Sequence, residues 1–310
     1  MSARPTPPDG VPALEVDPHL TLATDGTFAG LLSAYGAAYR RRALPSQIVQ
    51  AGAAVSGALF ADVLEVGTDD EVAGRLERGL ERAVPGIVAR MRRAFLSERP
   101  GIEVAVIRLA EAVRLDPAVV EDWTFEPSRT VSQWSGRVGR EAHRMEAFVR
   151  FETRSPSADS GQALEGGSEQ FVAEIRPEYN VLPILHHHFE TRYPTLAWRI
   201  VDVRRGIALV HTPEPDRAPG QPATALVPTS DLEVGEHTSE ESAYQSMWRA
   251  YFRAVDIPER KNLKLHLRHV PKRYWPYLVE KQPVIETPAS RSEPDAPSRP
   301  RRAVPARGPA

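Results

Sequence analysis

Cysteine is absent from this chain of 310 residues, and its absence removes several kinds of chemistry at once. Without thiols there is no disulfide, no thiolate zinc site, no cysteine-ligated iron–sulfur cluster and no cysteine nucleophile. A cysteine-free chain fits a reducing compartment. We therefore expect that an apolar core stabilises the protein, and that it has no cofactor and no metal of its own.

Long apolar runs are also missing. No stretch approaches the roughly 20 apolar residues that a membrane span needs, so no membrane contact is expected. Further prolines, and not an apolar segment, follow Met1 to Pro5, so we expect no signal peptide and a cytoplasmic location.

Several nucleotide-binding and catalytic motifs are absent as well. The sequence holds no GxxxxGKS or GxxxxGKT phosphate loop, no GxGxxG fingerprint and no HExxH helix. It also lacks a nucleophile elbow and the set of protein-kinase motifs. ATP hydrolysis, dinucleotide redox chemistry and zinc proteolysis are therefore poorly supported.

The residues that are present predict a folded core between two tails. Hydrophobic residues make up 41% of the chain, enough for a packed interior. Residues 1–18 are rich in Pro and Gly, and residues 282–310 are rich in Pro and Arg, so both ends are predicted to be disordered. Between them we expect one α+β domain over residues 19–281.

The part from residue 19 to residue 146 is predicted to be mainly helical. Two short strands are expected at Leu20–Ala23 and Val63–Val66. Thr68 or Asp69 could cap the helix that follows the second strand. Apolar residues at helical spacing predict helices at 28–39, 72–80, 87–96, 102–113 and 128–145.

The part from residue 147 to residue 281 is predicted to contain a sheet flanked by helices. Alternating apolar residues predict strands at 147–153, 170–176, 197–204 and 207–211. We expect these strands to form an antiparallel four-stranded meander, with loops at Ser155–Glu169 and Pro213–Asp231. Helices are expected at 181–192 and from about Ser239.

Positive charge is concentrated near the C-terminal end of the predicted domain. The net charge of the chain is −2, yet residues 248–281 hold nine Lys or Arg and only three Asp or Glu. Basic side chains neutralise phosphates, and exposed aromatic rings stack on unpaired bases. Candidate nucleic-acid contacts in this stretch are Arg260, Asn262, Lys272, Arg273, Tyr274 and Trp275. Alternatively, these aromatic rings fill the core and the charges only face solvent.

A second basic stretch lies at the end of the predicted helix 128–145. Arg140 and Arg144, with Arg150 just beyond, could contact phosphates as bidentate donors. Glu141 and His143 could act as an acid–base pair, although positions two apart on a helix diverge. Alternatively, this stretch is an exposed face with Glu141 paired to a neighbouring Arg.

Two further segments contain candidate site residues. Successive side chains on a helix point about 100° apart, so His186, His187 and His188 form a poor metal site, and none is predicted. His188 and Arg192 share a polar face that is either structural or lines a groove. Asp202 and Arg204 alternate onto one side of a strand, where an ion pair is the simplest interpretation and an Asp202 general base is the alternative.

Several blocks of residues follow one another along the chain: Leu22–Phe28, Ala94–Glu98, Arg140–Met145, Phe148–Phe151, His188–Phe189 with Arg192, Trp198 with Asp202 and Arg204, Trp248, Tyr251–Phe252, Ile257–Asn262 and Pro271–Trp275 with Glu280. Taken in order, these blocks resemble a bacterial family of domains of unknown function, family 4130, whose members are described as DNA-metabolism proteins. The resemblance implies a DNA-linked accessory role beside a radical-SAM repair or modification protein, and in some bacteria fusion to a uracil-DNA glycosylase-like module. It carries over no catalytic residue, and any iron–sulfur cluster would belong to the partner.

Three functions remain open from the sequence. The preferred hypothesis is an accessory protein that binds single-stranded or damaged DNA. The second is a DNA-acting hydrolase or glycosylase with Glu141, His143 or Asp202 as acid–base groups. The third is a docking module without DNA contact, anchored by Trp248, Tyr251 and Trp275. The groove expected in the first hypothesis is lined by Arg144, Arg150, Arg192, Lys272, Arg273, Tyr274 and Trp275.

Overall fold

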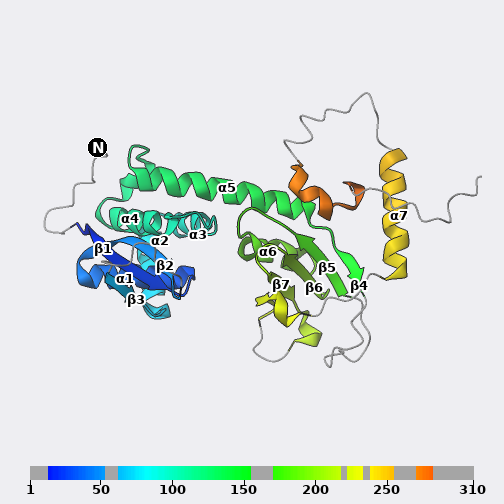
Figure 1. Cartoon of the computed structure of the whole chain (residues 1–310), viewed down its shortest axis with the longest axis horizontal. Coiled ribbons are helices and arrows are strands. Elements are labelled where there is room, and N and C mark those ends of the chain that lie inside the picture. The colour runs from blue at the N-terminus through cyan, green and yellow to red at the C-terminus, as the bar shows by residue number, and fades with distance from the viewer. Residues whose placement is uncertain are drawn as a thin grey trace, which may run out of the picture.

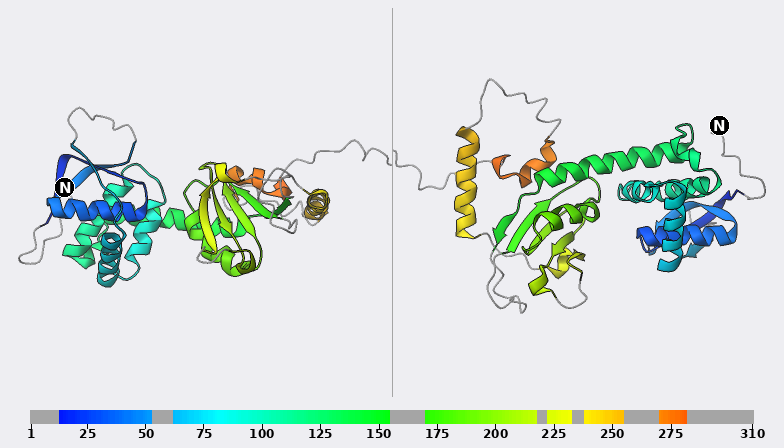
Figure 2. Two further views of the ribbon diagram at one scale, coloured as in Figure 1. Left: turned by 90° about the horizontal axis from the view of Figure 1, so that it is seen from below. Right: turned by 180° about the vertical axis from the view of Figure 1, so that it is seen from behind.

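The long helix α5 (Glu126–Phe148) organises the molecule. A computed structural model describes residues 13–52, 62–154, 170–217, 222–232, 238–254 and 270–281. Helices and a small sheet lie under the first half of α5, and a larger sheet lies under its second half (Figure 1). Figure 2 shows the same two groups from other sides, at the two ends of α5. The fold mixes helices and strands, as predicted.

The small sheet is parallel, with the strand order β2-β1-β3. It consists of β1 (Glu15–Thr24), β2 (Ala43–Gln50) and β3 (Asp62–Glu65). Both predicted strands are found, but β2 was not expected, and β1 begins inside the predicted N-terminal tail. A proline is tolerated in an edge strand or at a register irregularity. Pro45 lies in the edge strand β2, and Pro18 lies where the β1–β2 register shifts.

Four helices accompany this sheet: α1 (Phe28–Arg41), α2 (Asp70–Ala83), α3 (Ile87–Phe95) and α4 (Ile102–Leu115). All four were predicted from the spacing of their apolar residues. Of the two candidate caps of α2, Asp69 is the one used, because its carboxylate accepts a hydrogen bond from the Val72 amide at 3.0 Å. Thr68 instead donates its hydroxyl to Asp25 at 2.7 Å.

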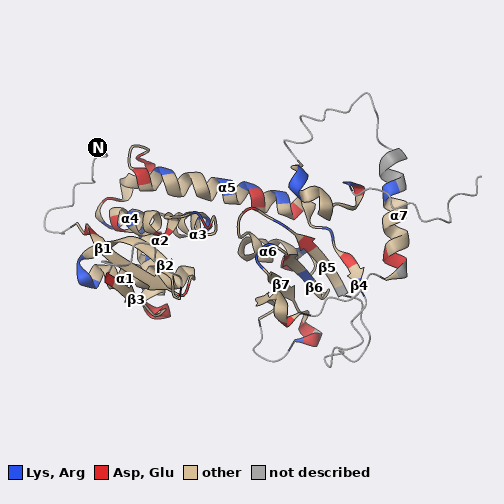
Figure 3. Cartoon of the chain, viewed as in Figure 1, with Lys and Arg blue, Asp and Glu red and all other residues tan. Residues whose placement is uncertain are grey.

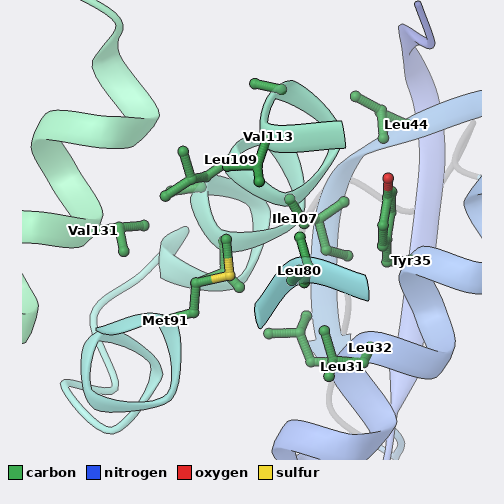
Figure 4. Close-up of a cluster of buried hydrophobic side chains, with 14 of the residues drawn as sticks. Leu31, Leu32, Tyr35, Leu44, Leu80, Met91, Ile107, Leu109, Val113 and Val131 are labelled. Carbon is green, nitrogen blue, oxygen red and sulfur yellow. The ribbon is translucent and has the colours of Figure 1, made fainter. Parts of the chain in front are cut away.

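The first hydrophobic core lies between the small sheet and these helices (Figure 4). Leu31, Leu32 and Met91 are fully buried there. The Tyr35 hydroxyl donates to the buried Glu111 carboxylate at 2.8 Å, so the polar end of this ring is satisfied inside the core.

The larger sheet is mixed, with the order β4-β5-β6-β7-β8. It consists of β4 (Glu152–Arg154), β5 (Gln170–Ile175), β6 (Trp198–Asp202), β7 (Ile207–His211) and β8 (Thr224–Pro228). The predicted four-stranded antiparallel meander is therefore corrected in two ways. β5 and β6 pair in parallel, because helix α6 (Leu182–Arg192) crosses over between them. β8 was not expected, since it lies in a Pro-rich stretch predicted as a loop.

The second hydrophobic core fills the space between the larger sheet, α6 and the second half of α5. Val131 of α5 lies in the first core, whereas Val138 and Met145 lie in the second. Phe95 and Trp134 pack against both. One uninterrupted helix thus joins the two cores, and the single domain expected from the sequence stays a prediction.

One more α-helix and five 3-10 helices complete the described residues. Helix α7 (Ser239–Ala254), predicted to begin near Ser239, lies at the outer edge of the larger sheet beside β4 (Figure 1). The 3-10 helices are η2 (Pro117–Glu121), η3 (Glu214–Asp216), η4 (Thr229–Asp231), η6 (Lys272–Tyr277) and η7 (Val279–Lys281). No helix among the described residues is long and apolar enough to cross a membrane. The expected loop Ser155–Glu169 and the tail 282–310 lie outside the described residues.

Candidate functional site

A hollow of about 970 Å³ follows one face of α5, and we call it the α5 groove. Positions three and four apart share one face of a helix, so a single stripe of α5 lines the groove over about 24 Å. The groove is lined by Ser132, Ser135, Gly136, Gly139, Arg140, His143, Arg144, Ala147 and Phe148 of α5, by Arg90 and Arg93 of α3, by Val120, Glu121 and Trp123 in or just after η2, and by Val270.

Small residues form the floor of the groove. Gly136 and Gly139 stand in the middle of α5, where each costs about 1 kcal/mol relative to alanine. A Cβ atom at Gly139 would lie 3.7 Å from the Arg93 guanidinium, and one at Gly136 would lie 3.4 Å from that of Arg140. Because the two glycines have no side chain, the surface of α5 is recessed beside the Arg93 and Arg140 side chains.

The charge of the groove is positive. Among the described residues, four arginines line it, against Glu121 as the one acidic lining residue. Arg90 lies 3.8 Å from Glu121, but no described carboxylate pairs with Arg93, Arg140 or Arg144. Figure 3 shows the basic and acidic positions along α5. Three guanidinium groups are thus available to an anion.

The predicted pairing of Glu141 with His143 does not form. His143 is exposed in the groove, and its Nδ1 lies 3.0 Å from the carboxylate of Glu146, one turn further along α5. Glu141 is buried on the opposite side of the helix, where it accepts hydrogen bonds from the backbone amides of Glu178 and Tyr179 at 2.9 and 2.8 Å. The two side chains diverge, as expected for positions two apart on a helix.

Glu141 also accepts hydrogen bonds from two of the side chains in the C-terminal stretch that were expected to contact DNA. The Tyr274 hydroxyl donates to it at 2.5 Å, and the Arg273 guanidinium at 3.2 Å. We call these three side chains the Glu141 network. Burial raises the pKa of Tyr274, and the hydrogen bond to Glu141 raises it further. The network joins α5 to η6, and it has the form of a structural anchor.

The burial of Tyr274 corrects its expected role. The ring is only 2% exposed and packs against Phe148, with the centroids 5.7 Å apart, so neither face is open to a base. Trp275 is half-buried, and its indole nitrogen donates to the Val270 carbonyl at 3.1 Å. Lys272 is exposed, but it does not line the groove.

Asp202 is fully buried in an ion pair. It accepts a hydrogen bond from the Arg205 guanidinium at 2.8 Å, whereas Arg204 contributes only its backbone amide at 3.0 Å. Arg205 also donates to Glu98 at 2.6 Å. The Arg204 guanidinium donates to the Glu178 carbonyl at 2.7 Å. The ion-pair interpretation of Asp202 is supported, with Arg205 and not Arg204 as its charged partner.

The residues expected from α6 lie away from the groove. The His188 ring packs edge-on against Phe189, and Arg192 donates to the Tyr193 hydroxyl at 3.1 Å. Among the described residues, no three His, Asp or Glu side chains gather closely enough to hold a metal ion.

The Arg150 side chain, just after the end of α5, already has partners within the protein. Its guanidinium donates to the Ala147 carbonyl at 2.7 Å and lies 3.7 Å from Glu280. Of the residues predicted to bind nucleic acid, Arg140 and Arg144 line the groove, and Arg260 and Asn262 lie outside the described residues. The single cleft expected from four segments is therefore corrected to a groove built on α5.

Three of the groove residues that sequence reasoning missed carry its charge or an exposed ring: Arg90, Arg93 and Trp123. Arg90 and Arg93 are one turn apart on α3, which is a detectable pattern, but only the packing of α3 against α5 aligns them with Arg140. Trp123 stands between two helices, and no periodicity marks it.

A family model for a domain of unknown function, DUF4130, matches residues 100–280. The chain belongs to this family. No curated protein and no solved structure matches the chain.

The DUF4130 match covers only part of the groove lining. It includes Trp123 and the whole of α5 with Arg140 and Arg144, but it begins after Arg90 and Arg93 of α3. The blocks of the resemblance before residue 100 also lie outside the match. The groove is therefore assembled from the family region and from the segment that precedes it.

Proposed function

We propose that the protein binds nucleic acid in the α5 groove and works as an accessory protein of DNA metabolism. The observation that carries this proposal is the set of guanidinium groups of Arg93, Arg140 and Arg144 along one groove, with which no carboxylate of the described residues pairs. A guanidinium group presents a rigid fork of donors that matches the oxygens of a phosphate. Several of them in a row suit a ligand with repeated phosphates.

The shape of the groove supports a polymeric anion. Arg140 and Arg144 are one helical turn apart, about 6 Å along the axis, and Arg93 approaches from the neighbouring helix near Gly139. The low floor at Gly136 and Gly139 leaves room for a sugar–phosphate backbone beside α5. Positive charge spread along an open groove also accelerates the encounter with a polyanion.

The surroundings of the acidic candidates favour binding over catalysis. Glu141 and Asp202 are buried and accept several hydrogen bonds each, so neither presents a free carboxylate to a substrate. A general base must lie within hydrogen-bond reach of the proton that it removes. The radical-SAM partner implied by the family resemblance stays a prediction.

The experiment compares two double charge reversals by fluorescence anisotropy with a labelled oligonucleotide. The variant Arg140→Glu/Arg144→Glu is expected to lose about 10- to 100-fold in affinity at low salt, because two phosphate contacts become repulsive. The control variant Arg75→Glu/Arg78→Glu makes the same change in net charge on exposed positions of α2, outside the groove.

The control is expected to keep its affinity within about threefold, since distant charges are screened. Equal losses in both variants would mean that only net charge matters, and they would refute the assignment to the groove. Circular dichroism melting of both proteins verifies that they are folded.

A further inference from the structure

The α5 groove has an exposed tryptophan at one end. Trp123 is 61% exposed, and among the large hydrophobic side chains of the described chain only Met247 is more exposed. Trp198, by contrast, is buried in the second core. Tryptophan buries more apolar surface than any other side chain, so an indole ring left open on a groove wall is available for a partner.

The loop that carries Trp123 is held in place. The Asp122 carboxylate accepts hydrogen bonds from the Thr124 amide at 2.8 Å and from the Thr124 hydroxyl at 2.6 Å. The Trp123 carbonyl accepts one from Arg129 of α5 at 3.3 Å. The indole is therefore presented from an ordered turn, which lowers the entropy lost when a ligand binds.

We infer that the groove takes single-stranded nucleic acid, with an unpaired base stacked on Trp123 and the phosphates on Arg93, Arg140 and Arg144. This inference rests on the proposed function and adds the strand form to it. A basic groove that follows the backbone, combined with an aromatic ring for a base, is the arrangement that binds single strands without regard to sequence.

The shape of the site argues against a duplex. A helix reads duplex DNA by entering the major groove, which is about 12 Å wide, and it must therefore protrude. Arg140 and Arg144 instead line a hollow, with Arg93 of α3 and Trp123 on its other walls. Bases that are paired inside a duplex would also have no free face for the indole.

The test measures the affinity of the full-length protein for three probes of equal length: a thymidine oligomer, a uridine oligomer and a DNA duplex. We expect at least one single strand to bind about tenfold or more tightly than the duplex. The two single strands distinguish DNA from RNA. Trp123→Ala should weaken single-strand binding by about five- to 150-fold, which is the usual contribution of one stacked base.

Two variants provide controls. Trp123→Phe keeps an aromatic face, so it should retain affinity within about threefold while the quenching of tryptophan fluorescence by the bound strand is lost. Tyr244→Ala removes a comparably exposed aromatic ring, 58% exposed, from α7 and should change nothing.

The outcomes separate the two proposals. Equal affinity for single strand and duplex, with no effect of Trp123→Ala, overturns the strand form and leaves the proposed function standing. Failure to bind any of the three probes at about 50 mM salt, where electrostatic binding is strong, overturns both.

Discussion

Replacing Tyr274 by phenylalanine separates a structural role of this residue from a role in binding. The change removes one hydroxyl, which donates to the buried Glu141 carboxylate at 2.5 Å and accepts from Arg273 at 2.9 Å. A hydrogen bond to a charged group contributes about 1.5 to 3 kcal/mol. Glu141 keeps its two backbone donors, so we expect the free energy of unfolding to fall by about that amount.

Urea denaturation at pH 7 measures this loss. Tryptophan fluorescence follows the unfolding, and of the five tryptophans Trp198 is buried in the second core with Tyr274. The midpoint should fall while the slope with urea stays unchanged. The control Tyr244→Phe removes an exposed hydroxyl and should cost less than about 0.5 kcal/mol.

The same variant tests the binding role that the sequence suggested. If Tyr274 is a core residue, the folded Tyr274→Phe protein binds an oligonucleotide as well as the parent does. An unchanged free energy of unfolding, together with lost affinity, would refute the structural role and restore Tyr274 as a contact.

Two further predictions concern stability. Burial raises the pKa of Tyr35 and Tyr274 above the ordinary value of 10.0; the folded protein therefore keeps protons that the unfolded chain loses, and stability should be complete below pH 10 and fall as the pH rises above it. Urea midpoints measured from pH 8 to pH 12 test this, and Tyr35→Phe should flatten the fall; a midpoint independent of pH contradicts it. Asp202→Asn removes the charge of one of the two carboxylates that pair with Arg205 and leaves Glu98 as the other, so unfolding should become easier by about 1.5 to 3 kcal/mol, the contribution of a hydrogen bond to a charged group. A urea midpoint equal to that of the parent would show that this ion pair contributes nothing.

The local structure of this protein could be predicted from its sequence better than its strand pairing. The helices were identified because their apolar residues recur at intervals of three and four. β2 was missed because Pro45 and its polar neighbours hide the alternation of an edge strand. The parallel pairing of β5 with β6 was missed because periodicity identifies a strand and not its neighbour.

The candidate site was predicted only in part, for a similar reason. Arg140 and Arg144 were identified from the spacing of charges on one helix. The sequence could not distinguish the buried ring of Tyr274 from the exposed ring of Trp123, because both stand beside charged residues in short irregular segments. Arg93 joins the site only through the packing of α3 against α5.

Photo-crosslinking tests most directly whether nucleic acid lies in the α5 groove. A thymidine oligomer with photoreactive bases would be bound to the full chain, irradiated and mapped by mass spectrometry of the peptides. Crosslinks should concentrate at Trp123 and within residues 132–147, with few at Arg192 or Lys272. Crosslinks concentrated on α6 or on residues 270–281, with none in the groove, would contradict the proposal.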